Sequence, residues 1–351
     1  MQNLPTKFGR KARVKIRNSG FLTGNSTELI INKDPSQSSE NDLQVTSSGS
    51  KSLESVIDTG EITIYNLSSD RRKLITQICE DKPTVVLEVG YKGREARPVP
   101  LKVLVQADIR HFTHGHNGTD WETTLYFGDG SDLMASTEIE MSFPGPVTTG
   151  QVFDKFVKLM KSLKDKDGKK SKVHVFSEIV SYVADEASDL FTPPKLNKLE
   201  KQISGKGFSF KGSPDELMAK LSLELGIKLK VQNNMIVPII RTKPIDGLTI
   251  VLIPETGLLG FPQRIEGGGV SFKAMLDPDL IPGCHVTFKP QDPNGMIAKE
   301  EVHQVVNIRY SLDNKDGPWV VDAEAKPIKD AIPKLPRNAS QTFPTGQTVV
   351  I

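Results

Sequence analysis

The chain has 351 residues, of which 37% are hydrophobic and 25% charged, as is usual for a globular protein of two or three domains. A net charge of +2 and an aromatic content of 6% do not indicate a nucleic-acid partner. The N-terminus lacks the apolar segment of a secretory signal, and no run of about 18 apolar residues predicts a membrane helix. We therefore expect synthesis in a cytoplasm, no membrane anchor and no sequence-specific nucleic-acid partner.

The first 130 residues have the pattern of β structure with one helix. The helix is expected in SSDRRKLITQICE, because a serine can cap it and Leu74, Ile75 and Ile78 share one face. Residues 34–56 are rich in Ser, Asp, Glu and Gln and predict a long exposed loop. Short β-rich runs bounded by turns predict strands at 12–16, 29–31, 62–65, 84–91, 101–112 and 121–127, the last two joined by the turn-rich segment THGHNGTD.

The middle of the chain changes to a helical period. Val152, Phe156 and their neighbours predict an amphipathic helix over 149–163. A second helix is expected at 175–190, followed by a proline-containing linker. Residues 206–240 then predict a small unit: the strand FSFKG, a helix that begins at SPDE, and the hairpin IKLKV-QNN-MIVPI.

The last third returns to β structure. The segment GLLGFPQ is expected to be a turn, shaped by Gly257, Gly260 and Pro262. Residues 331–351 predict a polar extended tail. Strands are predicted at 248–253, 269–273, 286–289, 302–311 and 319–325.

Two hairpins resemble each other. ADIRHFTHGHNGTDWETTLYF aligns with VNIRYSLDNKDGPWVVDAEA, so that the only two tryptophans, Trp121 and Trp319, begin equivalent strands. Two hairpins with polar turns can also look alike because turn chemistry restricts the residues. A duplicated β domain and a chance likeness therefore stay open from the sequence.

Several phrases, in order, resemble the baseplate hub proteins of contractile-tail phages, including the late control protein D group. The first is ITIYNLSSDRRKLI with the strand VVLEVGY after it, and the second is the FSFKGSPDEL unit. The third, TGLLGFPQRIEGGGVSFKAMLDPDLIPGCHVTF at 256–288, is the most similar, and VVNIRYSLDNKDGPWVVDAEA resembles the closing hairpin. The resemblance spans residues 60–325; the segments 34–56 and 164–203 depart from it.

The resemblance implies a structural hub and not an enzyme. Such a hub is a homotrimer whose two β-barrel-like domains form a pseudo-sixfold ring, joining the sixfold tail tube to the threefold central spike. The implied location is the tail baseplate of the virion. The implied partners are the tail tube or distal tail protein, the central spike protein and, as a further candidate, the tape measure protein. No cofactor is implied.

The expected fold is α+β and mainly β, with two β-barrel-like domains, an inserted helical segment and a small strand–helix–hairpin unit. The expected boundaries follow the changes of pattern along the chain. They are 1–130 for the first β domain, 131–205 for the helical or linker segment, 206–240 for the small unit, 241–330 for the second β domain and 331–351 for the tail.

Metal-ligating residue types occur in one place. His111, His114, His116 and Asp120 have the composition of a metal site, but they lie at a glycine-containing hairpin tip, which as readily predicts a solvated turn. The segment DKDG at 165–168 lacks the carboxylate spacing of a calcium loop. No catalytic, cofactor-binding or metal residue is therefore assigned.

Two other functions remain as alternatives. A tail-associated cell-wall hydrolase would need paired carboxylates, and Glu138 and Glu140 share one face of a predicted strand without a recognisable cleft. Lysines at 169, 170 and 172 predict a solvated loop more readily than a DNA contact.

The second alternative function is that of a receptor- or glycan-binding tail protein. For a hub, subunit contacts are expected at the strands 248–253 and 269–273 and at the two tryptophan hairpins, with sheet-edge pairing as the link.

Overall fold

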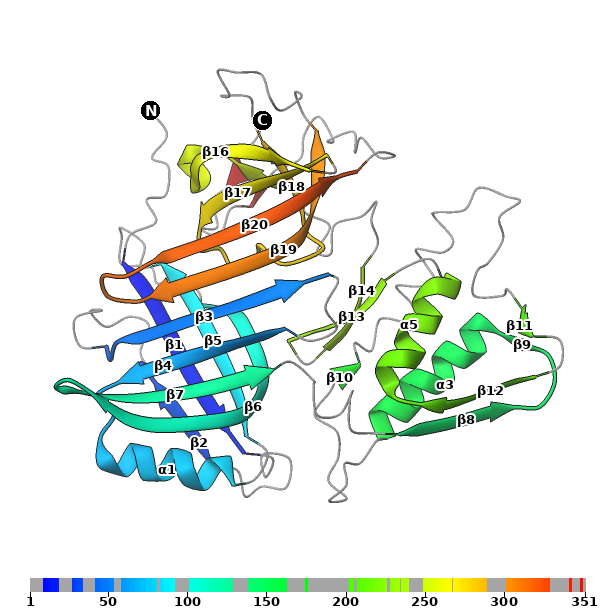
Figure 1. The fold of residues 1–351 in the computed structure, drawn as a ribbon, viewed down its shortest axis with the longest axis horizontal. Helices are drawn as coiled ribbons and strands as arrows, with labels where there is room; N and C mark the ends of the chain where they lie inside the picture. The colour runs from blue at the N-terminus through cyan, green and yellow to red at the C-terminus, as the bar shows by residue number, and fades with distance from the viewer. Residues whose placement is uncertain are drawn as a thin grey trace. The chain divides into compact units, whose positions relative to one another are not determined.

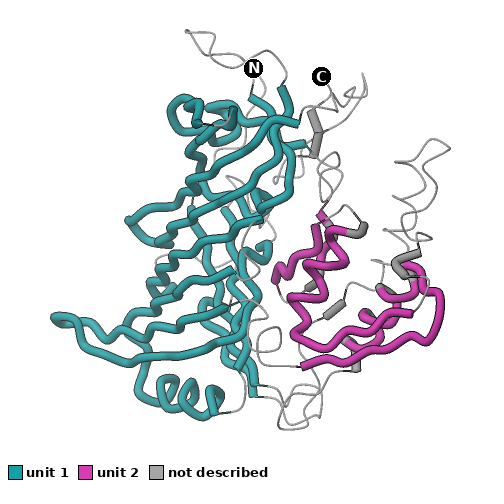
Figure 2. The backbone as a smooth tube through the Cα atoms, turned by 45° about the vertical axis from the view of Figure 1, so that its right-hand side comes forward, with its two compact units in different colours: residues 1–128, 241–351 teal, residues 129–240 magenta. Residues whose placement is uncertain are grey.

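The fold is mainly β, as predicted. The described residues belong to two compact units: residues 1–128 with 241–351, and residues 129–240 (Figure 2). The five-part division made from the sequence stays a prediction. The computed structural model describes residues 9–18, 27–33, 42–53, 58–80, 83–91, 101–128, 138–162, 174–175, 202–204, 207–225, 228–233, 235–239, 249–266, 268–288, 301–328, 341–342 and 348–349.

The first unit is built on one 13-stranded sheet (Figure 1). Its neighbours run β16-β17-β20-β19-β3-β4-β7-β6-β5-β1-β2, and β18 joins β15 to β19. No pairing among the described residues closes the strands of residues 1–128, or those of residues 241–351, into a barrel. The strands are β1 (Arg10–Arg17), β2 (Glu28–Ile31), β3 (Val45–Ser52), β4 (Thr59–Tyr65), β5 (Thr84–Tyr91), β6 (Lys102–Asn117), β7 (Asp120–Gly128), β15 (Thr249–Leu252), β16 (Leu258–Ile265), β17 (Gly269–Met275), β18 (His285–Phe288), β19 (Val302–Asp313) and β20 (Trp319–Pro327).

One hydrophobic core serves both halves of this unit. In Figure 1 the strands β1 and β5 cross behind β3 and β4, and buried residues of all four strands belong to the same cluster. The helix α1 (Ser69–Cys79) is capped by the side chain of Ser68, which accepts a hydrogen bond from the backbone N–H of Arg71. It buries Ile75 and Ile78 in the core, as their spacing predicts.

The prediction of an exposed loop over 34–56 is wrong for residues 45–52, which form β3. This strand pairs with β4 on one side and with β19 on the other. Its polar residues are satisfied where they are buried: Ser47 donates to the carbonyl of Glu61, and Lys51 donates to the carbonyl of Leu104. Small serines rather than large apolar residues fill this strand, so hydrophobic periodicity could not reveal it.

The expected turn GLLGFPQ also lies in a strand, so that prediction is wrong. It forms most of β16, and the register with β17 shifts between Leu259 and Gln263, which leaves Gly260, Phe261 and Pro262 as a bulge. Gly260 has a φ of 72°, a conformation that favours glycine. The glycine and proline therefore mark a break within an edge strand and not the end of one.

Six strands recur in the first unit with the same order along the chain and the same neighbours. The first set runs β3-β4-β7-β6-β5-β1 across the sheet, and the second runs β16-β17-β20-β19-β18-β15. In chain order, β1, β3, β4, β5, β6 and β7 of the first set therefore correspond to β15, β16, β17, β18, β19 and β20 of the second. One pair differs, because β1 and β5 are antiparallel whereas β15 and β18 are parallel.

The pairing registers of the two sets agree as well. Each tryptophan hairpin has one bulge in its first strand, at Arg110 in β6 and at Val306 in β19. Each bulge comes the same number of residues before the partner of the tryptophan, His116 or Leu312. The equivalence of the tryptophans is thus confirmed. The sequence alignment also places Ile109-Arg110-His111 opposite Ile308-Arg309-Tyr310, and this part is wrong. Ile109 and Val305, which each precede the bulge, are the equivalent residues, and the loop of the second hairpin is the longer one.

The second unit contains the predicted strand–helix–hairpin elements. Its helix α5 begins after Ser213, whose backbone N–H donates to the carboxylate of Glu216, and it buries Leu217 and Leu221. The predicted helix at 149–163 is present as α3, whereas the one at 175–190 lies outside the described residues. The elements are β8 (Ile139–Phe143), β9 (Val147–Thr148), α3 (Thr149–Ser162), β10 (His174–Val175), β11 (Gln202–Ser204), β12 (Phe208–Gly212), α5 (Pro214–Leu225), β13 (Lys228–Gln232) and β14 (Met235–Ile239). Two short strands, β21 (Gln341–Thr342) and β22 (Thr348–Val349), pair near the C-terminus.

Candidate assembly interface

The two repeated halves are joined through β3 and β19. Their antiparallel ladder runs from Asn307 opposite Ser52 to Asp313 opposite Thr46. In this ladder Gly49 lies opposite Tyr310, and a Cβ at Gly49 would lie 2.3 Å from the Tyr310 hydroxyl. The glycine lets a buried aromatic ring cross the strand, which fixes this register.

A buried asparagine fastens the loop of the second hairpin to the first half. The side chain of Asn314 accepts from the N–H of Val45 at 2.8 Å and donates to the carbonyl of Leu43 at 3.0 Å. Beside it, Gln44 donates to the Asp313 carboxylate at 2.9 Å. These bonds satisfy backbone groups where β3 begins, so the loop and the strand depend on each other.

Aromatic contacts also join the first half to the second hairpin. The rings of Tyr91 and Trp319 pack edge to face with centroids 6.1 Å apart, and the Tyr91 hydroxyl donates to the carbonyl of Leu276 at 2.7 Å. Arg10 donates to the carbonyls of Asp313 and Gly317 in the loop. Trp319 is consequently 2% exposed.

The equivalent tryptophan of the first half lies on the surface. Trp121 is 37% exposed at the tip of the β6–β7 hairpin, where its ring contacts His116, with centroids 3.8 Å apart. Arg72 of α1 stacks over the same ring at 3.9 Å. Equivalent positions of the two halves thus differ in one respect: the second hairpin tip is covered by the first half, and the first tip is open.

The four candidate metal ligands do not converge, and Asp120 instead accepts a hydrogen bond from the side chain of Asn66 at 2.9 Å. His111 stacks on Tyr126, whereas His114 and His116 lie on the opposite face of β6, and His114 contacts the hydroxyl of Thr123 at 3.0 Å. Burial, together with the positive charge of Arg72, lowers the pKa of His114. Among the described residues no group of three or more His, Cys, Asp or Glu is arranged to hold a metal ion.

The outer strand of the second half carries an exposed apolar surface. Leu259 is 38% exposed and Phe261, in the bulge of β16, is 61% exposed. Within the described parts of the chain, β17 is the only strand paired with β16. The strand 269–273, expected at a subunit contact, is paired on both sides by β16 and β20, so the edge next to it is β16. The strand expected at 248–253 contains β15, which among the described residues pairs with β18 alone.

A family model described as baseplate hub gp41 matches residues 27–325. The chain belongs to this baseplate hub family. Proteins of this family are structural components of the phage tail baseplate, so this hub is a structural protein of the virion tail and not an enzyme. The resemblance seen in the sequence is thereby confirmed.

Several solved structures are similar to this hub. The 43 kDa tail protein of prophage MuSo2 from Shewanella oneidensis is 11% identical, with 90% of this chain and 98% of that chain covered and a TM-score of 0.49. A tail protein from Neisseria meningitidis MC58 is 10% identical, with 91% and 96% covered and a TM-score of 0.48. The E. coli c3393 protein, described as a type VI secretion component, is 8% identical, with 82% and 74% covered and a TM-score of 0.47. No curated protein matches the hub.

The remaining candidates from the sequence are surface features or lie outside the described residues. Glu140 is exposed in β8, and Glu138 forms a surface ion pair with Lys211 at 3.5 Å. The DKDG segment and the neighbouring lysines are not described. Cys79 and Cys284 are free thiols, and burial raises the pKa of Cys79 to about 11. None of the described helices is long and apolar enough to cross a membrane.

The sequence did not reveal the residues that make the junction. Asn314, Gln44 and Arg10 lie in segments that predict only polar turns or termini, and β3 lacks an apolar stripe. The usable signal was the pair of tryptophans, which identified the repeated hairpins. The two exposed apolar residues of β16 were hidden because GLLGFPQ predicts a turn.

Proposed function

We propose that this baseplate hub acts as a homotrimer that joins the sixfold tail tube to the threefold central spike. The supporting observation is the repeat of six strands in the same chain order and the same sheet order. Three chains with two copies each supply six similar β units, which matches the symmetry of a tube. The rest of each chain occurs three times, which matches a spike.

The repeat alone does not require a ring, but the junction favours one. Within a chain the second copy is joined to the first by strand pairing and a buried loop, and both copies share one sheet. A ring of alternating first and second copies reuses this arrangement at each boundary. Closed assembly of this kind also covers sheet edges that would otherwise be open to aggregation.

The proposed partners follow from this placement. On the sixfold side they are the tail tube protein or a distal tail protein, with the tape measure protein as a further candidate, and on the threefold side the central spike protein. The tail is proposed to be contractile. The second unit, residues 129–240, occurs once per repeat pair and is therefore proposed to follow the threefold symmetry.

Electron microscopy of the purified hub tests this proposal. Class averages viewed down the assembly axis are expected to show a ring of six similar lobes, together with features of the second unit that repeat three times. Averages that show a ring with another number of lobes, or an open filament, would contradict the role of symmetry adaptor.

A further inference from the structure

We infer that neighbouring subunits are joined by β16 of one chain lying against the outer half of β6 of the next, in the antiparallel manner of β3 and β19 within the chain. This inference rests on the proposed trimer and names its contact. It follows from the repeat, because each of the two strands that join the halves within the chain, β3 and β19, has an equivalent strand with an open edge, β16 and β6 respectively, among the described residues. The occupant of the surface is therefore a second copy of this chain.

The first counterpart is the edge of β6. In the second half, the ladder between β18 and β19 ends at Gln304, and β3 pairs with β19 from Asn307 onward on the same side. In the first half, the ladder between β5 and β6 ends at Asp108, which is the residue equivalent to Gln304. From His111 to Asn117, no strand of the described residues pairs with that side of β6.

The second counterpart is β16, which corresponds to β3. Val45 of β3 is paired with Ile64 and begins its ladder with β4, as Leu258 of β16 is paired with Ala274 and begins its ladder with β17. Both Val45 and Leu258 are buried. β3 pairs on its other side with the second half of its own chain, whereas β16 has no such neighbour in the described part of the chain.

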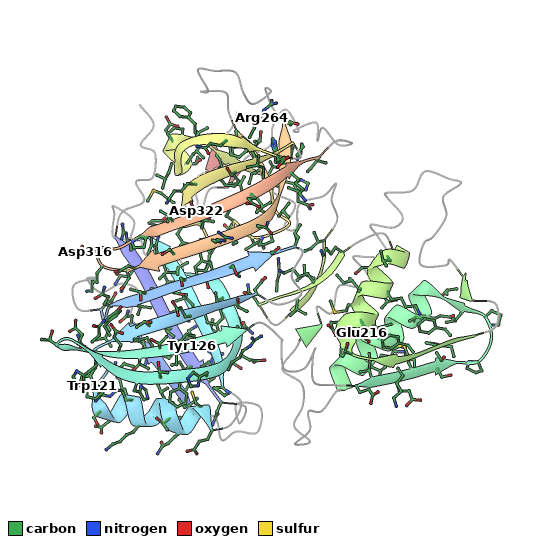
Figure 3. The ribbon with its side chains drawn as sticks, in the orientation of Figure 1. Trp121, Tyr126, Glu216, Arg264, Asp316 and Asp322 are labelled. Carbon is green, nitrogen blue, oxygen red and sulfur yellow. The ribbon has the colours of Figure 1, made fainter. Side chains whose placement is uncertain are left out.

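These two surfaces cannot meet within one chain. Figure 3 labels Arg264 of β16 and Trp121 of the β6–β7 hairpin at opposite ends of the first unit. Between them in the sheet lie β17, β20, β19, β3, β4 and β7. A contact between the β16 edge and the β6 edge therefore requires another copy, and under the threefold rotation of the proposed trimer it closes a ring.

The apolar residues of the two surfaces are complementary. The bulge at Gly260, Phe261 and Pro262 occupies the position in β16 that Ser47 occupies in β3. Ser47 lies opposite Leu312 in the internal ladder, and Leu312 is equivalent to His116. In the next subunit Phe261 would thus lie beside His116 and Trp121. This contact would cover two of the large aromatic side chains that are exposed in the single chain.

The bulge also restricts which strands can pair with this edge. Proline lacks an N–H and a bulge interrupts the ladder, so β16 does not accept an arbitrary strand along its whole length. Pairing is confined to Gln263, Arg264 and Ile265, with Phe261 packed against the partner hairpin. The internal pair of Ser48 and Ser311 predicts that Gln263 of one subunit lies opposite Gly115 of the next.

Disulfide trapping tests this register directly. The double variant Gln263→Cys, Gly115→Cys is made in a Cys79→Ser, Cys284→Ala background and oxidised with a mild oxidant. Gly115 has open space around it and Gln263 is exposed, so both positions accept the change. Residues paired in an antiparallel ladder have Cα atoms about 4.5–5.5 Å apart, which suits a disulfide. The matched control combines Gly115→Cys with Asp322→Cys, an exposed position on β20.

The expected result is a covalent trimer on a non-reducing gel for the Gln263 pair and none for the Asp322 pair. A hub that is trimeric in solution but forms no covalent product with the Gln263 pair overturns the β16–β6 contact and leaves the proposed trimer intact. A hub that is monomeric in solution overturns both. Equal trapping by the two pairs would show random collision and would also overturn the contact.

An independent variant removes the aromatic contact without a cysteine. Phe261→Ser is expected to raise the concentration at which the trimer dissociates by about tenfold or more, because buried aromatic anchors dominate interfaces. Leu223→Ser, which changes a residue 85% exposed in the second unit, is the control and should leave that concentration unchanged. An unchanged dissociation of the Phe261 variant, with native circular dichroism, contradicts the inference.

Discussion

At the scale of single residues, Gly49 occupies a position from which a side chain is excluded. Gly49→Ala is expected to destabilise the hub by about 1–3 kcal/mol, because the added methyl group would overlap the buried ring of Tyr310. The measurement is the free energy of unfolding in urea. Gly115→Ala, which changes a strand glycine with nothing within 4 Å of the added Cβ, is the control and should cost under about 0.5 kcal/mol. Equal losses would argue against close packing at Gly49.

A second residue-scale prediction concerns Glu88 in β5. Burial opposes its ionisation, but hydrogen bonds from Lys15 and Arg13 outweigh that effect and lower the pKa of the carboxyl group. A lowered pKa stabilises the fold above the unfolded-state pKa of about 4.3, and the stabilisation is lost as the pH falls through the folded-state pKa. Glu88→Gln should therefore cost about 1–2 kcal/mol at pH 7, with little difference from the natural protein at the acid end. Urea unfolding of both proteins across this pH range measures it, and a pH-independent difference would contradict it.

At the scale of elements, the loop of the second hairpin holds β3 in place. Asn314→Ala is expected to lower the free energy of unfolding by about 1–3 kcal/mol, because it leaves the N–H of Val45 without its buried partner, while the carbonyl of Leu43 keeps its other donor, the side chain of Asn32. Asp316→Ala, in the same loop but exposed, is the matched control. Hydrogen exchange should become faster in β3 and β19 of the first variant only. Unchanged exchange there would mean that the loop does not support the strand.

The elements also show what the sequence could and could not predict. Short β-rich runs located β5 and both tryptophan hairpins, and the 3.6-residue period located α1 and α3, because each of these elements buries apolar side chains. β3 was missed because serines replace apolar residues in it, and β16 because glycine and proline form a bulge inside a strand. β3 lies at the boundary between the two repeats, and β16 is the outer strand of the second repeat. Pairing there depends on distant segments, which local sequence does not encode.

At the scale of the whole molecule, the repeat explains why similar elements have different surroundings. Trp319 is buried by the first half of its own chain, and Trp121 is exposed at the equivalent place. Likewise, among the residues that the structure describes, β3 is paired on both sides and β16 on one. The single chain therefore contains one complete junction and the two separate surfaces of another. The sequence indicated the repeat through its tryptophans, but the register of the strands was needed to match these surfaces.

The most direct test of the hub as a symmetric assembly is its mass in solution. Light scattering of the purified protein at several concentrations is predicted to give three times the chain mass of 38.6 kDa, with dissociation only on dilution. That result would make the repeated β unit a component of a ring with six similar members. A mass of one chain at every concentration would contradict the account, because the open edges of β6 and β16 would then have no second copy to bind.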